Sequence, residues 1–170
     1  MDALSDLPEQ FERFYPAVFR YFRLRGADAD TANDLASAAF ERALANLKRF
    51  DPRKGSFAAW IFTIARNLAA NQWASPASRT AALADDLPAA GLPLELDLIQ
   101  LEDRRELLAA LDELDGRERE LLALKFASRF TNRQIAALTG LSESNVGVIL
   151  YRSLGRLRAR LARSEEVSYE

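Results

Sequence analysis

The side chains with the clearest chemical use lie on one predicted helix near the C-terminal end of the chain. Short polar groups come first along this helix, and arginines follow at helical spacing. Hydroxyl and amide groups can hydrogen-bond the edges of bases, whereas guanidinium groups pair with phosphates. The helix therefore predicts a surface that binds nucleic acid, and its assigned residues are Ser142, Ser144, Asn145, Val148, Arg152, Arg156 and Arg158.

The charge of this segment supports that interpretation. Five arginines and a single acid, Glu143, lie between Gly140 and Arg163, which gives a local net charge of +4. The whole chain has a net charge of −2. A basic stripe within a mildly acidic protein is typical of a DNA-binding protein, but helix pairs with a solvated arginine face also occur in proteins that never bind DNA. Because phosphate contacts supply most non-specific affinity, the overall acidity indicates either local basic patches or a partner that adds affinity.

Two predicted helices position these groups. Thr131 and Gln134 are spaced as an N-terminal capping box, and Gly140 suits the left-handed position that ends a helix. Ser142 can then cap a longer second helix. Two helices joined by a short turn around a glycine form the helix-turn-helix pattern, whose second helix enters the DNA major groove. The buried face of that helix is predicted at Val146, Ile149, Leu150, Leu154, Leu157 and Leu161.

Composition argues against bond-making chemistry. The chain has no cysteine and no histidine, so a thiol nucleophile, the commonest general base and the usual zinc ligands are all missing. We therefore expect no enzyme, no cofactor and no metal site. No apolar run reaches the roughly 18 residues of a membrane span, and no signal peptide is recognisable. These features predict a soluble, cytoplasmic protein without membrane insertion.

The N-terminal part predicts three amphipathic helices, at about residues 7–25, 28–48 and 56–73. Pro16 should begin a new segment of the first helix or kink it. A turn at residues 50–56 contains both proline and glycine, and Ser56 can cap the third helix. The second helix is expected to bury Leu35, Ala39, Phe40, Ala43, Leu44 and Leu47. The third is expected to bury Phe57, Trp60, Ile61, Ile64, Ala65 and Leu68.

An acidic tether separates this part from the helix-turn-helix. Six acids and no basic residue lie between Thr80 and Asp103, among several prolines. Helical periodicity resumes near Leu98, and a further helix is expected at about residues 116–126. The predicted fold is therefore all-α, with two small helical domains joined by an acidic linker. The boundaries are residues 1–75 for the first domain, 76–98 for the linker, 99–163 for the second domain and 164–170 for an acidic tail.

Several short motifs in a fixed order then make the chain resemble a family. In the first domain these are Asp34-Leu35, Phe40-Glu41-Arg42-Ala43, and Arg-Phe-Asp-Pro at residues 49–52, followed by the continuous match at residues 55–67. In the second they are Leu-Asp-Glu-Leu at 111–114, Arg-Glu-Arg-Glu at 117–120, Leu-Lys-Phe at 124–126 and Leu-Ser-Glu-Ser-Asn-Val at 141–146. Together they resemble the bacterial sigma-70 family of RNA polymerase sigma factors, extracytoplasmic-function subgroup, over nearly the whole chain.

The resemblance implies specific roles for residues. The helix-turn-helix would bind the −35 promoter element, and the first domain would open and hold the −10 element. The implied −10 residues are Phe50, Arg53, Lys54, Ser56 and Asn67, and those that would contact polymerase are Asp34, Leu35, Phe40, Glu41 and Arg42. Trp60 fits either the core or base stacking, with the core favoured by its spacing. The acidic linker resembles the segment that enters the RNA channel of polymerase, although a merely solvated tether remains the alternative.

The implied partners are core RNA polymerase, through the clamp of its largest subunit and the flap of its second subunit, promoter DNA, and an anti-sigma factor. The expected function is promoter-specific transcription initiation. The first alternative is a sigma-like decoy that sequesters an anti-sigma protein without directing transcription, and the second is an ordinary helix-turn-helix repressor. The chain departs from the family where Ala36-Ser37-Ala38-Ala39 replaces a Gln-Glu pair and where residues 68–75 carry no charge. The first departure removes polar contacts to polymerase.

Overall fold

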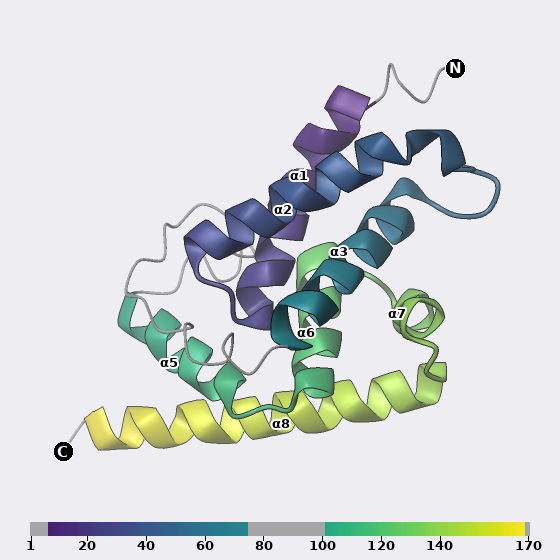
Figure 1. The fold of residues 1–170 in the computed structure, drawn as a ribbon. Coiled ribbons are helices and arrows are strands. Elements are labelled where there is room, and N and C mark those ends of the chain that lie inside the picture. Colours follow the sequence, from purple (N-terminus) through teal and green to yellow (C-terminus); the bar gives the residue numbers. More distant parts are fainter. Residues whose placement is uncertain (1–6, 75–100, 169–170) are drawn as a thin grey trace. The chain divides into compact units, whose positions relative to one another are not determined.

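A computed structural model describes residues 7–74 and 101–168, with side chains described for residues 7–74 and 105–163 (Figure 1). Every regular element in these ranges is a helix, as the sequence predicts. The chain divides into two compact units. The predicted linker at residues 76–98 lies outside the described residues. No helix within the described residues is both long and apolar enough to cross a membrane.

The first unit consists of helix α1 (Leu7–Arg25) apart from its last two residues, helices α2 (Ala29–Ala45) and α3 (Phe57–Ala74), and a short 3-10 helix, η1 (Leu47–Arg49). Asp28 caps α2, because its carboxylate accepts a hydrogen bond from the Thr31 backbone N–H at 2.7 Å. Ser56 caps α3 as predicted, accepting from the Ala59 N–H at 3.1 Å. Pro16 lies inside α1, which continues through it as one helix.

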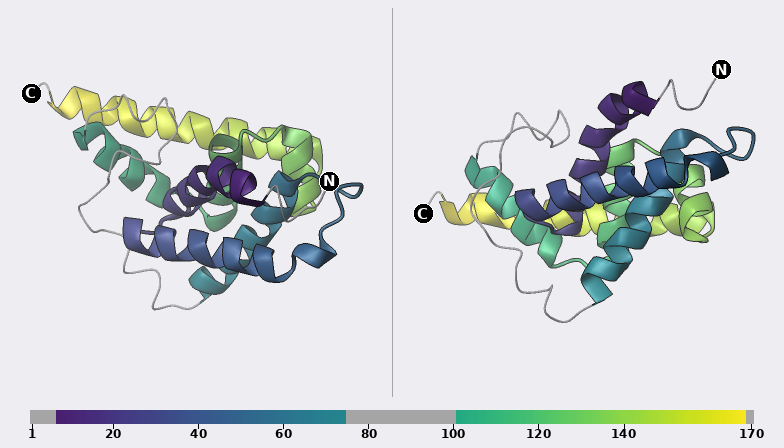
Figure 2. Two further views of the ribbon diagram at one scale, coloured as in Figure 1. Left: turned by 90° about the horizontal axis from the view of Figure 1, so that it is seen from above. Right: turned by 45° about the horizontal axis from the view of Figure 1, so that its top comes forward.

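Small residues allow the helices of the first unit to pack closely. The buried face of α2 consists mainly of alanines, and α2 and α3 lie side by side in each view (Figure 2). Larger side chains fill the space between the helices, and each contributes about 1.5–3 kcal/mol when buried. The fully buried ones are Val18, Tyr21, Phe22, Ile61 and Phe62.

Two expectations about this core are wrong. Leu44 is predicted to be buried, but it lies one residue before the end of α2, and 53% of it is exposed. Conversely, Phe62 falls outside the predicted apolar face of the third helix and has no exposed surface. Helical periodicity locates an apolar stripe, but the neighbouring helices decide how wide that stripe is.

The second unit consists of α5 (Leu101–Asp112), α6 (Gly116–Ser128), α7 (Asn132–Thr139) and α8 (Glu143–Ser168). The first three all pack against α8, the longest helix in the described residues (Figure 1). The predicted capping box of Thr131 and Gln134 is present at the start of α7, and Gly140 ends that helix with a positive φ of 75°. A second capping box, of Asp115 and Glu118, begins α6.

Candidate nucleic-acid interface

Helix α8 has two distinct faces near its N-terminus. Val146, Leu150 and Ser153 are buried against the rest of the second unit. The opposite face is open to solvent, and it includes Ser144, Asn145, Val148 and Arg152. Of the seven residues predicted to bind DNA, all are exposed, Ser142 and Arg158 among them. The structure therefore brings the polar start of the helix and Arg152 onto one accessible surface.

Ser142 has a structural task within this surface. Its hydroxyl accepts a hydrogen bond from the backbone N–H of Asn145 at 3.2 Å, which satisfies one of the unpaired donors at the start of α8. Its main effect is thus to fix where the helix begins and which residues it presents.

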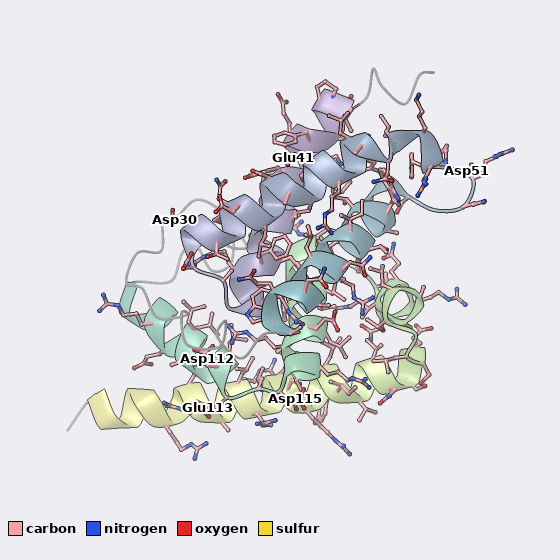
Figure 3. The ribbon with its side chains drawn as sticks, in the orientation of Figure 1. Asp30, Glu41, Asp51, Asp112, Glu113 and Asp115 are labelled. Atoms are coloured by element: carbon pink, nitrogen blue, oxygen red, sulfur yellow. The ribbon has the colours of Figure 1, made fainter. Side chains whose placement is uncertain are left out.

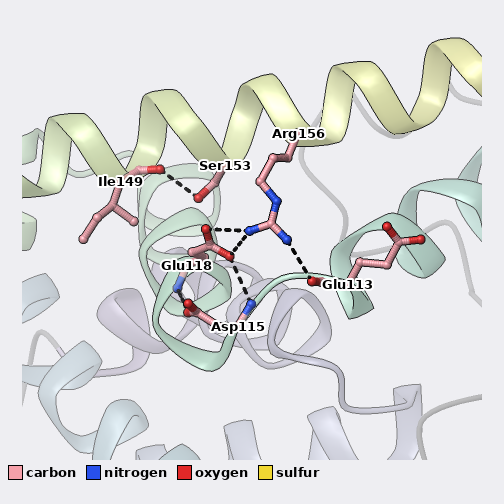
Figure 4. A network of polar contacts seen from close by, with 6 residues as sticks. All are labelled: Glu113, Asp115, Glu118, Ile149, Ser153 and Arg156. Atoms are coloured by element: carbon pink, nitrogen blue, oxygen red, sulfur yellow. Dashed lines mark hydrogen bonds and ion pairs between the residues drawn. The ribbon is translucent and has the colours of Figure 1, made fainter.

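Arg156 also has partners inside the protein (Figure 4). One of its terminal nitrogens donates to both carboxylate oxygens of Glu118, at 2.8 and 2.7 Å, and the other donates to the Glu113 carbonyl at 3.2 Å. Arg160 pairs with the Glu113 carboxylate at 2.9 Å. Two of the five arginines that give this segment its charge are therefore paired with acids, one directly after α5 and one in the first turn of α6. The sequence pattern did not reveal these ion pairs.

The loop between η1 and α3 forms a second candidate surface, in the first unit. Phe50 on the loop clusters with two aromatic rings at the start of α3, with centroids separated by 5.0 Å for Phe50 and Trp60 and by 5.7 Å for Phe57 and Trp60. Trp60 is half-buried, so it both packs against the loop and reaches the surface. Beside it lies an open cavity of about 260 Å³, lined by Arg49, Phe50, Asp51, Lys54, Gly55, Ser56, Ala59, Trp60 and Thr63.

Charges around this cavity are partly compensated. Figure 3 shows Asp51 on the loop, and its carboxylate accepts hydrogen bonds from two side-chain nitrogens of Arg53, at 3.0 and 3.1 Å. These bonds, followed by one from the Arg53 backbone N–H, hold the pKa of Asp51 below its usual value. Lys54 and Ser56 are exposed beside the pair. The Arg53 side chain is itself 89% exposed, so both basic groups of the loop are accessible.

Asn67 lies on α3, beyond the aromatic cluster. Its neighbours Leu68 and Ala69 are buried, as is Ala65, but Asn67 itself is exposed. Its amide thus offers donors and an acceptor at the surface of the first unit.

Helix α2 carries the residues assigned to a protein partner. Asp34, Glu41 and Arg42 are exposed, and Leu35 is half-buried. Phe40 is only 6% exposed and packs edge-on against Phe11 at 4.8 Å between centroids. Phe40 therefore packs beneath the exposed residues of α2 and contributes little surface of its own.

An apolar groove that the sequence did not reveal lies next to these residues. It measures about 430 Å³, and Phe11 and Leu44 stand partly exposed on it. Their exposure could not be read from helical spacing, because both sit at positions that would continue a buried stripe. The groove is lined by Leu7, Pro8, Phe11, Ser37, Phe40, Glu41 and Leu44.

The second unit also contains an apolar pocket, of about 230 Å³. Its walls come from α5, α6 and α8, chiefly Leu107, Leu111, Leu122, Phe126, Leu157 and Leu161. Within the described residues, no group of three or more acids could hold a metal ion.

Two segments of the chain match known sequence families. Residues 10–80 match Sigma-70 region 2, and residues 104–157 match Sigma-70, region 4. The ECF RNA polymerase sigma factor EcfG of Rhodopseudomonas palustris is 34% identical over 134 residues, which cover 79% of this chain and 73% of that one. The ECF RNA polymerase sigma factor BldN of Streptomyces coelicolor is 30% identical over 155 residues. That match covers 89% of this chain but only 58% of BldN.

Solved structures agree at the level of the fold. The sigma factor RpoE, crystallised in complex with the anti-sigma factor NepR from Bartonella quintana, has a TM-score of 0.72 and 24% identity. That match covers 92% of this chain and 97% of the other. CnrH, in complex with the cytosolic domain of CnrY, has a TM-score of 0.67 and 22% identity, covering 94% and 90% of the two chains. The chain therefore belongs to the sigma-70 family of RNA polymerase sigma factors, in its extracytoplasmic-function subgroup.

Proposed function

We propose that this protein is a transcription initiation factor that binds core RNA polymerase and directs it to promoters through their −35 and −10 elements. The observation that carries the proposal is the presence, in one chain, of two different surfaces that suit nucleic acid. One is the helix-turn-helix, whose second helix α8 exposes polar groups near its start. The other is an aromatic-lined loop cavity of the kind that can hold an unstacked base.

In this proposal α8 reads the −35 element in the major groove. Ser144, Asn145 and Val148 face the bases, while Arg152 and Arg158 face phosphates. Ser142 fixes the start of the helix, and Arg156 anchors the helix to α6.

The first unit would act on the −10 element after the strands separate. Phe50 and Trp60 offer stacking surfaces beside the loop cavity, and Ser56 and Lys54 lie at its edge. Arg53, although paired with Asp51, lies on the same loop and would add positive charge beside the bound strand. The exposed amide of Asn67 can grip the edge of a flipped base, which a duplex hides.

Protein partners complete the proposal. Asp34, Glu41 and Arg42 on α2, together with Leu35 and supported by Phe40, would contact the clamp of the largest polymerase subunit. The second unit would contact the flap of the second subunit. The complex of the similar RpoE with NepR supports an anti-sigma partner for this chain as well. The protein would act in the cytoplasm, with domain boundaries at residues 1–75, 76–98 and 99–163 and an acidic tail at 164–170.

A sigma-like decoy is the alternative that one observation favours. Ala36 and Ala39 are buried, and Ser37 and Ala38 are half-buried, so this stretch of α2 offers few polar groups to polymerase. A decoy would still bind an anti-sigma protein but would not direct transcription.

Run-off transcription decides between these functions. Purified protein is mixed with core polymerase and a template that carries the region upstream of its own gene, and the matched control is core polymerase alone. A transcript that depends on the protein and disappears when either promoter element is scrambled supports the proposal. Binding to an anti-sigma protein without any such transcript supports the decoy. Tight binding of the protein alone to a palindromic duplex would instead indicate a repressor.

A further inference from the structure

Tyr151 is exposed without any packing role in the second unit. Its exposed fraction is 82%, the largest of any bulky apolar side chain in the described part of the protein. Val148, three residues earlier on α8, is 46% exposed. The buried side of this helix segment is formed by Val146, Leu150 and Ser153, so the fold itself does not need an aromatic ring at position 151.

Helix geometry places Tyr151 on the same face as the residues assigned to base reading. At about 100° per residue, Ser144 and Tyr151 lie roughly 40° and 60° to one side of Val148, and Arg152 lies roughly 40° to the other. All four are exposed. The face that would enter the major groove is therefore polar at its start and carries two apolar groups, Val148 and Tyr151, at its centre and edge.

The chemistry of the major groove limits what these apolar groups can recognise. Base edges there consist of hydrogen-bond donors and acceptors, with one apolar group, the 5-methyl of thymine. We propose that Val148 and Tyr151 recognise thymine methyl groups within the −35 element, which makes Tyr151 a specificity-determining residue. This inference rests on the proposed function and adds a chemical class of base to it.

A protein partner is the competing occupant for an exposed tyrosine. Two observations favour DNA. Exposed polar and basic groups share the stripe of the helix that carries the ring, with Ser144 seven residues before Tyr151 and Arg158 seven residues after it. In addition, the ring lies in the N-terminal half of the second helix of a helix-turn-helix, the part that enters the groove.

The test replaces single thymines by deoxyuridine, which removes only the methyl group. Holoenzyme, formed from the full chain and core polymerase, is bound to promoter templates with deoxyuridine at each thymine of the −35 element in turn. For wild type we expect affinity to fall about three- to fivefold at one or two positions, as for one buried methyl group. Tyr151→Ala and Val148→Ala should each bind the natural template more weakly and lose the sensitivity at the position that they contact.

Arg152→Ala is the matched control, because it is exposed on the same helix face. It should weaken binding to every template while keeping the sensitivity to deoxyuridine. The inference is overturned if wild-type holoenzyme transcribes from the promoter but tolerates deoxyuridine everywhere, or if both variants keep the wild-type sensitivity. It is also overturned if Tyr151→Ala weakens binding to core polymerase and leaves base preference unchanged, because the face then serves a protein. If wild-type holoenzyme initiates at no promoter, the proposed function fails and takes this inference with it.

Discussion

Replacement of Arg156 by alanine separates a structural role from a DNA-binding role. The guanidinium group makes two charge-assisted hydrogen bonds to Glu118 and one bond to the Glu113 carbonyl. The Glu118 side chain is only 16% exposed, whereas that of Arg156 is 54% exposed. Loss of the arginine therefore leaves a mostly buried carboxylate without its cationic partner, although Glu118 still accepts a hydrogen bond from the Asp115 N–H at 3.1 Å.

The expected cost lies between two known limits. Exposed ion pairs contribute about 0.2–1 kcal/mol, and removal of one partner from a buried pair costs about 3–5 kcal/mol. Because one partner here is half-exposed and the other keeps a backbone donor, we expect Arg156→Ala to lower the free energy of unfolding by about 1–2 kcal/mol. For a unit of this size, the unfolding midpoint should fall by about 5–10 °C. Arg156→Lys should lower the free energy of unfolding by about half as much, because an ammonium group keeps the charge but not the planar guanidinium geometry.

Thermal unfolding of the full chain by circular dichroism measures the midpoint, and hydrogen exchange shows where protection is lost. Exchange should accelerate at the start of α6 and in the facing part of α8. Arg152→Ala, on the same helix but exposed, should change stability by less than about 0.5 kcal/mol. Instead, it should make the slope of log affinity against log salt concentration shallower by about one unit for promoter binding. If Arg156→Ala leaves unfolding unchanged and reduces that slope, Arg156 is a phosphate ligand and does not anchor the helix.

Three further outcomes are expected. Asn67→Ala should impair promoter opening but leave polymerase binding near normal, because its amide meets a base only after strand separation. On a template pre-opened across the −10 element, the variant should still bind more weakly when the captured base is present and lose little when that position is abasic. Equal binding of wild type and variant to both pre-opened templates would contradict the assignment. The hydrogen bond from the Thr31 N–H is the main cause that holds the pKa of Asp28 below its ordinary value of 3.8. The ionised carboxylate therefore stabilises α2 fully above pH 3.8, and this contribution is lost as the pH falls through the lowered pKa of the folded state. Asp28→Asn should therefore keep most of the cap at neutral pH and flatten the loss of stability in acid titrations followed by circular dichroism. Gly155→Ala should raise the free energy of unfolding in urea by about 0.5–1 kcal/mol, because a methyl group there meets no atom within 4 Å; destabilisation would mean that the helix needs glycine.

The features that the sequence predicted well depend on neighbouring residues. The caps at Ser56, Thr131 and Ser142 and the left-handed end at Gly140 each involve groups within four residues along the chain. Their signals are therefore complete in a short stretch of sequence. The same holds for the helix-turn-helix, whose two capped helices and glycine turn follow one another directly.

The features that the sequence missed depend on contacts between distant residues. Glu118 and Arg156 are 38 residues apart, and nothing local distinguishes Arg156 from Arg152. The burial of Phe62 and the exposure of Leu44 likewise depend on which helix covers each position. Tyr151 could have been found, because it lies three residues after Val148 and outside the apolar stripe. Periodicity shows that such a residue is exposed but not that its exposure has a use.

The ion pairs on α8 bear directly on how the protein can grip DNA. Pairing of Arg156 and Arg160 leaves three of the five arginines in this segment, Arg152, Arg158 and Arg163, to meet phosphates. Three phosphate contacts correspond to a salt slope of about −3, whereas proteins that bind DNA alone commonly make about 6–10 such contacts. Helix α8 by itself therefore provides recognition with little electrostatic affinity. This division fits a factor that depends on polymerase to hold it on the promoter, and it argues against a repressor that must stay on its site unaided.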